Sequence, residues 1–147
     1  MIYKQTDHYF NGQINKYGCL FFSLLDIAEE HVGRVFASAQ IKAVYLELIA
    51  TGAMRDDCYV LDHAAVIATG CQSLGLFAPV RYVGAHYNDE ITDRKSWGVK
   101  HGHEMILQYL TPKGNTHFRR PHYDPYQPPI GFTNLMSVRW YNVGEIT

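Results

Sequence analysis

One segment of the sequence, residues 19–28, is apolar at nearly every position and constrains the fold more than any other. It reads CLFFSLLDIA, and EEH follows shortly before Gly33. A helix that is hydrophobic all round is buried on every side rather than along one stripe. Glycine commonly ends a helix, because it adopts the left-handed conformation without strain. The sequence therefore predicts a buried helix over residues 19–32 that runs through the centre of the protein.

The rest of the chain divides into helices before residue 79 and strands after it. We expect an irregular lead-in over 1–18, a helix over 40–51 closed by Gly52, and a helix over about 61–73 with Asp62 as its N-cap. Helices followed by antiparallel strands predict an α+β fold, and 147 residues predict a single domain, 1–147. The predicted strands cover residues 80–84, 105–110, 116–119, 122–124 and 137–143.

Composition narrows the classes of partner and site. The formal net charge of −1 favours neither nucleic acid nor an anionic membrane as a partner. No apolar run approaches the ~20 residues of a spanning helix, and residues 1–7 lack the apolar core of a secretory signal, so we expect a cytoplasmic protein. The three cysteines, Cys19, Cys58 and Cys71, show no CxxC spacing, which indicates at least one free thiol rather than a disulfide framework. No cofactor is expected, and the sequence does not indicate an oligomeric state.

Cys19 is the best candidate for a nucleophile. It would occupy the first turn of the buried helix, where unpaired backbone N–H groups and the positive end of the helix dipole favour an anion. A thiolate is such an anion and is the reactive form of cysteine. Gly18 allows a sharp turn before the helix. Gln13, six residues upstream, could donate a hydrogen bond beside the sulfur and complete an oxyanion hole with the Cys19 N–H. Burial alone would also explain a cysteine at this place.

A thiol nucleophile needs a base, and the base needs a group that orients it. A tight turn centred on Arg120 and Pro121 would place His117 opposite Asp124 on neighbouring strands, with Cβ atoms about 5 Å apart. Asp124 could then hold one ring nitrogen and leave the other to face the sulfur. His122 is a rival base, but it lies out of phase with this pair.

A second constellation, His101-Gly102-His103, offers two imidazoles on one side of an extended segment. Together with His117, His122 or Asp124 it could bind a divalent metal, which would make the protein a metal-binding hydrolase. In another arrangement His103 is the base for Cys19, and Asp124 still orients it.

The motifs resemble those of a known group. Gln13-x-x-x-x-Gly18-Cys19 opens a buried helix, and the segments 116–118 (THF) and 123–126 (YDPY) follow far downstream. This arrangement resembles the papain-like cysteine peptidases, and most closely the compact branch that removes double-glycine leaders from bacteriocins. It is also similar to small papain-like proteins of phages and other mobile elements.

The resemblance implies a papain-like fold, with N-terminal helices and a central buried helix packed on a C-terminal antiparallel sheet. It implies Cys19 as nucleophile, His117 as base, Asp124 as orienting group and Gln13 as oxyanion donor. The implied reaction is hydrolysis of an amide bond in a peptide or peptidoglycan stem, with a peptide or protein as substrate. The His-to-Asp interval is shorter here than in that branch. The alternative is a catalytically silent papain-like binding or inhibitory module, encoded by a phage and acting on a host partner.

Overall fold

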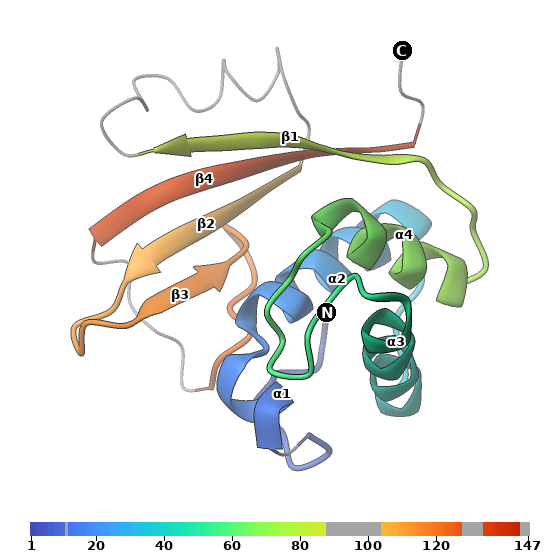
Figure 1. Cartoon of the computed structure of the whole chain (residues 1–147), viewed down its shortest axis with the longest axis horizontal. Coiled ribbons are helices and arrows are strands. Elements are labelled where there is room, and N and C mark those ends of the chain that lie inside the picture. The colour runs from blue at the N-terminus through green and yellow to red at the C-terminus, as the bar shows by residue number, and fades with distance from the viewer. Residues whose placement is uncertain (11, 88–103, 128–133, 145–147) are drawn as a thin grey trace.

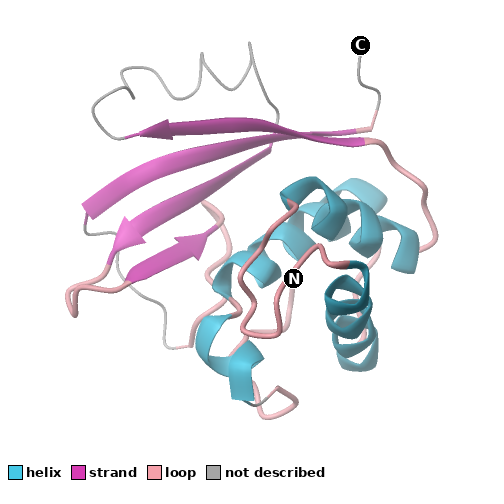
Figure 2. Cartoon of the chain, viewed as in Figure 1, coloured by secondary structure: helices cyan, strands magenta, loops and turns pink. Residues whose placement is uncertain are grey.

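The structure, a computed structural model, describes residues 1–10, 12–87, 104–127 and 134–144. In these ranges four helices precede four strands, as the α+β prediction requires, and the two kinds of element occupy separate sides of the molecule (Figure 2). No helix in the described ranges has the length and apolar character needed to cross a membrane. The elements are α1 (Gly12–Tyr17), α2 (Cys19–Val32), α3 (Ser38–Thr51), α4 (His63–Ser73), β1 (Val80–Tyr87), β2 (Glu104–Leu110), β3 (Thr116–Arg119) and β4 (Asn134–Val143).

The buried helix has the bounds that its apolar run predicts. α2 spans Cys19–Val32, and all residues from Phe21 to Glu29 are buried. Gly33 ends the helix in the left-handed conformation (φ 76°), and its N–H donates to the Glu29 carbonyl. α2 packs against α4 on one side and against β3 on another (Figure 1), so it links the helices to the sheet.

The other predicted helices form with small changes in their bounds. α3 begins two residues earlier than the pattern indicated and ends at Gly52, whose φ is 81°. Asp62 caps α4 as predicted, because its carboxylate accepts a hydrogen bond from the Ala65 N–H at 3.0 Å. α4 packs against α3 and also against β1, so it is a second link between the helices and the sheet.

The four strands form one antiparallel sheet in the order β1-β4-β2-β3. Its two faces bury separate apolar groups. Ile106 and Tyr141 belong to the main core around α2. Side chains that alternate with them on the opposite face form a second cluster, which consists of Leu107, Tyr109, Val138 and Trp140. β2 and β4 therefore bury side chains on both of their faces.

Two local predictions were wrong. Residues 12–17 form α1 and are not irregular. Residues 122–124 do not form a strand: the chain after β3 makes one bridge between Arg120 and Tyr123, so the turn centres on Pro121 and His122, one residue later than predicted. Proline favours the first central position of a type I turn and disfavours the second, which is where the predicted turn had placed Pro121.

Candidate functional site

Cys19 is the first residue of α2, and its side chain is half-buried. The start of an α-helix leaves backbone N–H groups without intrahelical acceptors, and these groups favour negative charge nearby. Gly18 precedes Cys19 as the N-cap, and its N–H donates to the Ile14 carbonyl of α1. A Cβ on Gly18 would lie 2.5 Å from that carbonyl oxygen. A glycine is therefore required here by the close approach of α1, which fixes the position of Cys19.

His117 and Asp124 form a buried pair. Nε2 of His117 lies 2.6 Å from Oδ1 of Asp124, and each residue is 4% exposed. The carboxylate also accepts a hydrogen bond from the Tyr126 N–H at 3.0 Å, and Arg119 lies 3.4 Å from its second oxygen. The predicted partner of His117 is thus in place although the predicted strand at 122–124 is absent, because Asp124 reaches β3 from the loop that follows the turn.

The Cys19 side chain is the second group that interacts with the His117 ring. Burial by itself lowers the pKa of His117, but the hydrogen bonds with Asp124 and Cys19, together with the negative charges of both, raise it to about 9. Since Asp124 occupies Nε2, Nδ1 is the nitrogen that remains for the thiol. At neutral pH this arrangement favours an imidazolium between a carboxylate and a sulfur atom.

Cys19 lines a cavity of about 480 Å³. The other walls come from α1, from residues 57–60, from His63 of α4, and from the sheet residues Gln108, Phe118 and Arg139. His117 is buried and is not among the residues that line the cavity. The thiol is therefore the member of the Cys19–His117–Asp124 group that borders the cavity directly, with His117 behind it.

The other two thiols differ from Cys19. Cys58 and Cys71 are both buried. Burial, with smaller effects of nearby negative charges, raises the pKa of Cys58 to about 12, and burial raises that of Cys71 to about 11. Cys58 also lines the cavity, and its Sγ lies 3.9 Å from the Gln13 carbonyl oxygen. Neither thiol is paired with a base among the described residues.

Gln13 is not placed as the resemblance implies. It lies in α1 with an exposed side chain, and it is not among the residues that line the cavity. In the described part of the chain its side-chain amide has no hydrogen-bond partner. The role of Gln13 as oxyanion donor therefore has no support in this arrangement.

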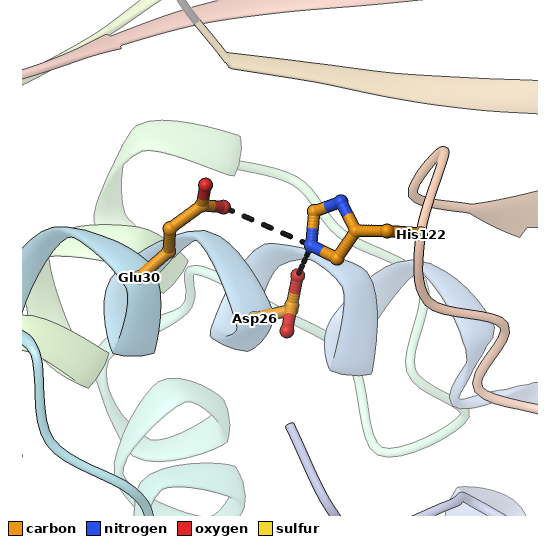
Figure 3. Close-up of side chains that lie close together, drawn as sticks. All are labelled: Asp26, Glu30 and His122. Carbon is orange, nitrogen blue, oxygen red and sulfur yellow. Dashed lines mark ion pairs between the residues drawn. The ribbon is translucent and has the colours of Figure 1, made fainter.

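His122 lies in a separate cluster with Asp26 and Glu30 of α2 (Figure 3). Its Nε2 lies 3.3 Å from Oδ2 of Asp26 and 3.9 Å from Oε2 of Glu30. Arg120 is buried in the same region and pairs with Glu30 at 2.7 Å and with Glu104 at 2.8 Å. The guanidinium of Arg120 thus neutralises the carboxylates of Asp26 and Glu30. The cluster joins the turn after β3 to α2 and does not resemble a free metal site. This position also removes His122 as a base for Cys19.

The predicted alternatives that use His101 and His103 fall on residues outside the described ranges. His117 and Asp124, which that metal site would have shared, are hydrogen-bonded to each other.

Two residues of the cavity wall, His63 and Arg139, were not predicted from the sequence. His63 stacks on Tyr82 with ring centroids 4.5 Å apart, and its Nδ1 lies 2.7 Å from the Tyr141 hydroxyl. Burial and the charge of Arg139 lower the pKa of His63 to about 4, so its ring is neutral at neutral pH. The alternation of the predicted strand 137–143 places Arg139 and Tyr141 on one face, but it does not say that this face borders Cys19.

Comparisons with known proteins give a family but no activity. No curated protein and no solved structure matches the chain, so the resemblance to papain-like peptidases stays a prediction. One family model covers residues 1–113, which include Cys19 and all four helices and end before His117 and Asp124. The match spans well over half of the 147 residues, and the chain therefore belongs to the family described as "Protein of unknown function, DUF261".

Proposed function

We propose that this protein is a cysteine hydrolase that cleaves an amide bond in a peptide or in a peptidoglycan stem. The observation that carries the proposal is the position of His117 between Asp124, to which it is hydrogen-bonded, and Cys19, which lines an open cavity. A thiol, an imidazole and a carboxylate in this order form the arrangement that nucleophilic catalysis by cysteine requires.

In the first half of the reaction, the Cys19 thiolate attacks the carbonyl carbon of the substrate and forms a tetrahedral intermediate. The N–H groups at the start of α2 stabilise the oxyanion. The C–N bond then breaks, and the proton that His117 carries passes to the leaving amine. The products of this half are the free amine and a thioester between Cys19 and the acyl group.

In the second half, water enters the site that the amine has left. His117, now neutral, takes a proton from the water as it attacks the thioester carbonyl. The carboxylic acid leaves, and Cys19 is again a thiolate beside an imidazolium. Asp124 keeps Nε2 of His117 occupied throughout, so that Nδ1 stays directed to the sulfur and to the substrate.

Selective alkylation tests whether Cys19 is activated. With iodoacetamide at pH 6.5, we expect Cys19 to react at least 100-fold faster than Cys58 and Cys71, because the thiolate is the reactive species. The raised pKa values of about 12 and about 11 leave almost no thiolate on the two buried cysteines. Mass spectrometry of the digested protein measures the three rates separately.

The activity itself is tested with mixed peptides and with peptidoglycan fragments, in which new amine groups are detected by mass spectrometry. The Cys19→Ser variant is the control, since it keeps the size of the side chain and removes the thiol. A Cys19 that reacts no faster than a free model thiol, with no new amines formed, would contradict the proposal. That outcome would favour the alternative of a catalytically silent binding module.

A further inference from the structure

We infer that Arg139 forms a subsite for a carboxylate of the substrate, beside the nucleophile. This inference rests on the proposed function, since it concerns the molecule that Cys19 attacks. Arg139 belongs to β4 and lines the same cavity as Cys19.

The guanidinium of Arg139 has no carboxylate partner among the described residues. Its hydrogen bonds are long and go to neutral oxygens, 3.5 Å to the Tyr82 hydroxyl and 3.4 Å to the Gln108 side-chain carbonyl. Its Nε is buried, and within the part of the chain that the structure describes it has no hydrogen-bond partner. An arginine has five N–H donors in a planar fork that matches the two oxygens of a carboxylate. The two hydrogen bonds leave further terminal N–H donors of the guanidinium for a ligand.

The surroundings hold the side chain in place. The guanidinium lies over the Phe118 ring, 5.1 Å from its centroid, and the Gln108 carbonyl that it contacts also accepts a hydrogen bond from Ser137 at 2.8 Å. A fixed guanidinium loses less side-chain entropy on binding than a mobile one. The wall around Arg139 is therefore organised before a ligand arrives.

The charges around the cavity favour an anion. Arg139 and Lys16 are the basic residues of its wall, and Asp57 is the acidic one. Asp57 is already paired with Arg55 at 2.7 Å, which neutralises it. His63, the remaining titratable group on this wall besides the thiols and tyrosines, is neutral at neutral pH. An anionic group in the cavity thus meets uncompensated positive charge.

Two alkylating reagents of similar size test the inference. Iodoacetate carries a carboxylate and iodoacetamide a neutral amide, and both react with the thiolate. The ratio of their rates at Cys19 cancels any change in thiolate fraction and reports the attraction of the carboxylate alone. We expect Arg139→Gln to lower the iodoacetate-to-iodoacetamide ratio by about 5- to 10-fold at low ionic strength, and salt to reduce this difference.

Two variants serve as controls. Arg139→Lys keeps the positive charge and should retain most of the ratio. Arg81→Gln removes an exposed arginine of β1 that is not part of the cavity wall and should leave the ratio unchanged. A ratio that is the same in the native protein, in Arg139→Gln and in Arg81→Gln would overturn the inference. At pH 8.5 an ordinary thiol is also ionised, so the ratio measured there tests Arg139 even if Cys19 proves not to be activated.

Three acetylated peptides identify the source of the carboxylate. Acetyl-Gly-Glu-Gly-amide offers an acidic side chain, acetyl-Gly-Gly-Gly offers a C-terminal carboxylate, and acetyl-Gly-Gly-Gly-amide offers neither. Protection of Cys19 from iodoacetamide by one of the first two, lost in Arg139→Gln, supports the subsite and names its ligand. Equal protection by all three peptides, or by none, would overturn a carboxylate subsite for peptides.

Discussion

Replacing His117 with glutamine is expected to slow the alkylation of Cys19 by iodoacetamide about 30- to 100-fold at pH 6. A thiol without a charged partner has a pKa near 8.5, so only about 0.3% of it is ionised at pH 6. An imidazolium beside a sulfur atom stabilises negative charge on it, and so favours its attack on the reagent. The alkylation rate rises less than the ionised fraction of a thiol does, because a thiolate that is stabilised by a charged partner is a weaker nucleophile. Glutamine can still donate a hydrogen bond to Asp124, so that the variant removes the charge and keeps a polar side chain in the buried site.

The pH dependence distinguishes this effect from damage to the fold. At pH 9.5 an ordinary thiol ionises by itself, and the rates of the native protein and of His117→Gln should converge. The matched control is His8→Gln, which changes an exposed histidine and should leave the rate unchanged at both pH values. A difference of less than threefold at pH 6 between native protein and His117→Gln would contradict the assignment of His117 as the partner of Cys19.

Removing the carboxylate of Asp124 is expected to give the largest loss of stability among the site variants. Asp124→Ala leaves Nε2 of His117 and the Tyr126 N–H without their acceptor in a buried place. Breaking a buried ion pair by removing one partner costs about 3–5 kcal/mol in the free energy of unfolding. Asp124→Asn keeps an acceptor and should cost less than half as much. The exposed residue Glu47 gives the control, since Glu47→Ala should change stability by less than about 0.5 kcal/mol.

The cost of Asp124→Ala should depend on pH with a definite sign. The pKa of His117 is raised in the folded protein, from 6.5 to about 9, so the stabilisation of its charged form is complete below pH 6.5 and is lost as the pH rises through 9. The difference in unfolding free energy between native protein and Asp124→Ala should therefore be larger at pH 7 than at pH 10. Urea denaturation at the two pH values measures it. An equal difference at both pH values would show that His117 is not charged beside Asp124.

The order of elements and the position of Cys19 at the start of α2 could be predicted because both depend on local sequence. The apolar run after Cys19 permits only a buried helix, and Gly33, Gly52 and Asp62 mark helix ends through their own backbone or side-chain chemistry. The contact between His117 and Asp124 was also predicted, although through a hairpin register that does not form. The contact forms although the predicted register was wrong, because a tight turn brings side chains seven positions apart together in more than one geometry.

The features that could not be predicted depend on contacts between distant segments. The exposed position of Gln13 follows from the direction of α1, which the sequence did not reveal as a helix. His63 and Arg139 border the same cavity because α4 packs against β1 and β4 lies next to β1, and strand order is not encoded in the alternation of any single strand. The ion pairs of Arg120 with Glu30 of α2 and Glu104 of β2 could not be predicted for the same reason, because they join elements that are distant in the sequence.

The central claim is that Cys19 and His117 act as a coupled pair, and an NMR titration of the His117 ring tests it most directly. If the imidazolium stabilises the thiolate, the thiolate must raise the pKa of the imidazole by the same free energy. We expect His117 to titrate near pH 9 in the native protein, and its midpoint to fall by about one unit or more in Cys19→Ala. Cys71→Ala, which changes a buried thiol of α4, should leave the midpoint unchanged. The same midpoint in the native protein and in Cys19→Ala would contradict the claim.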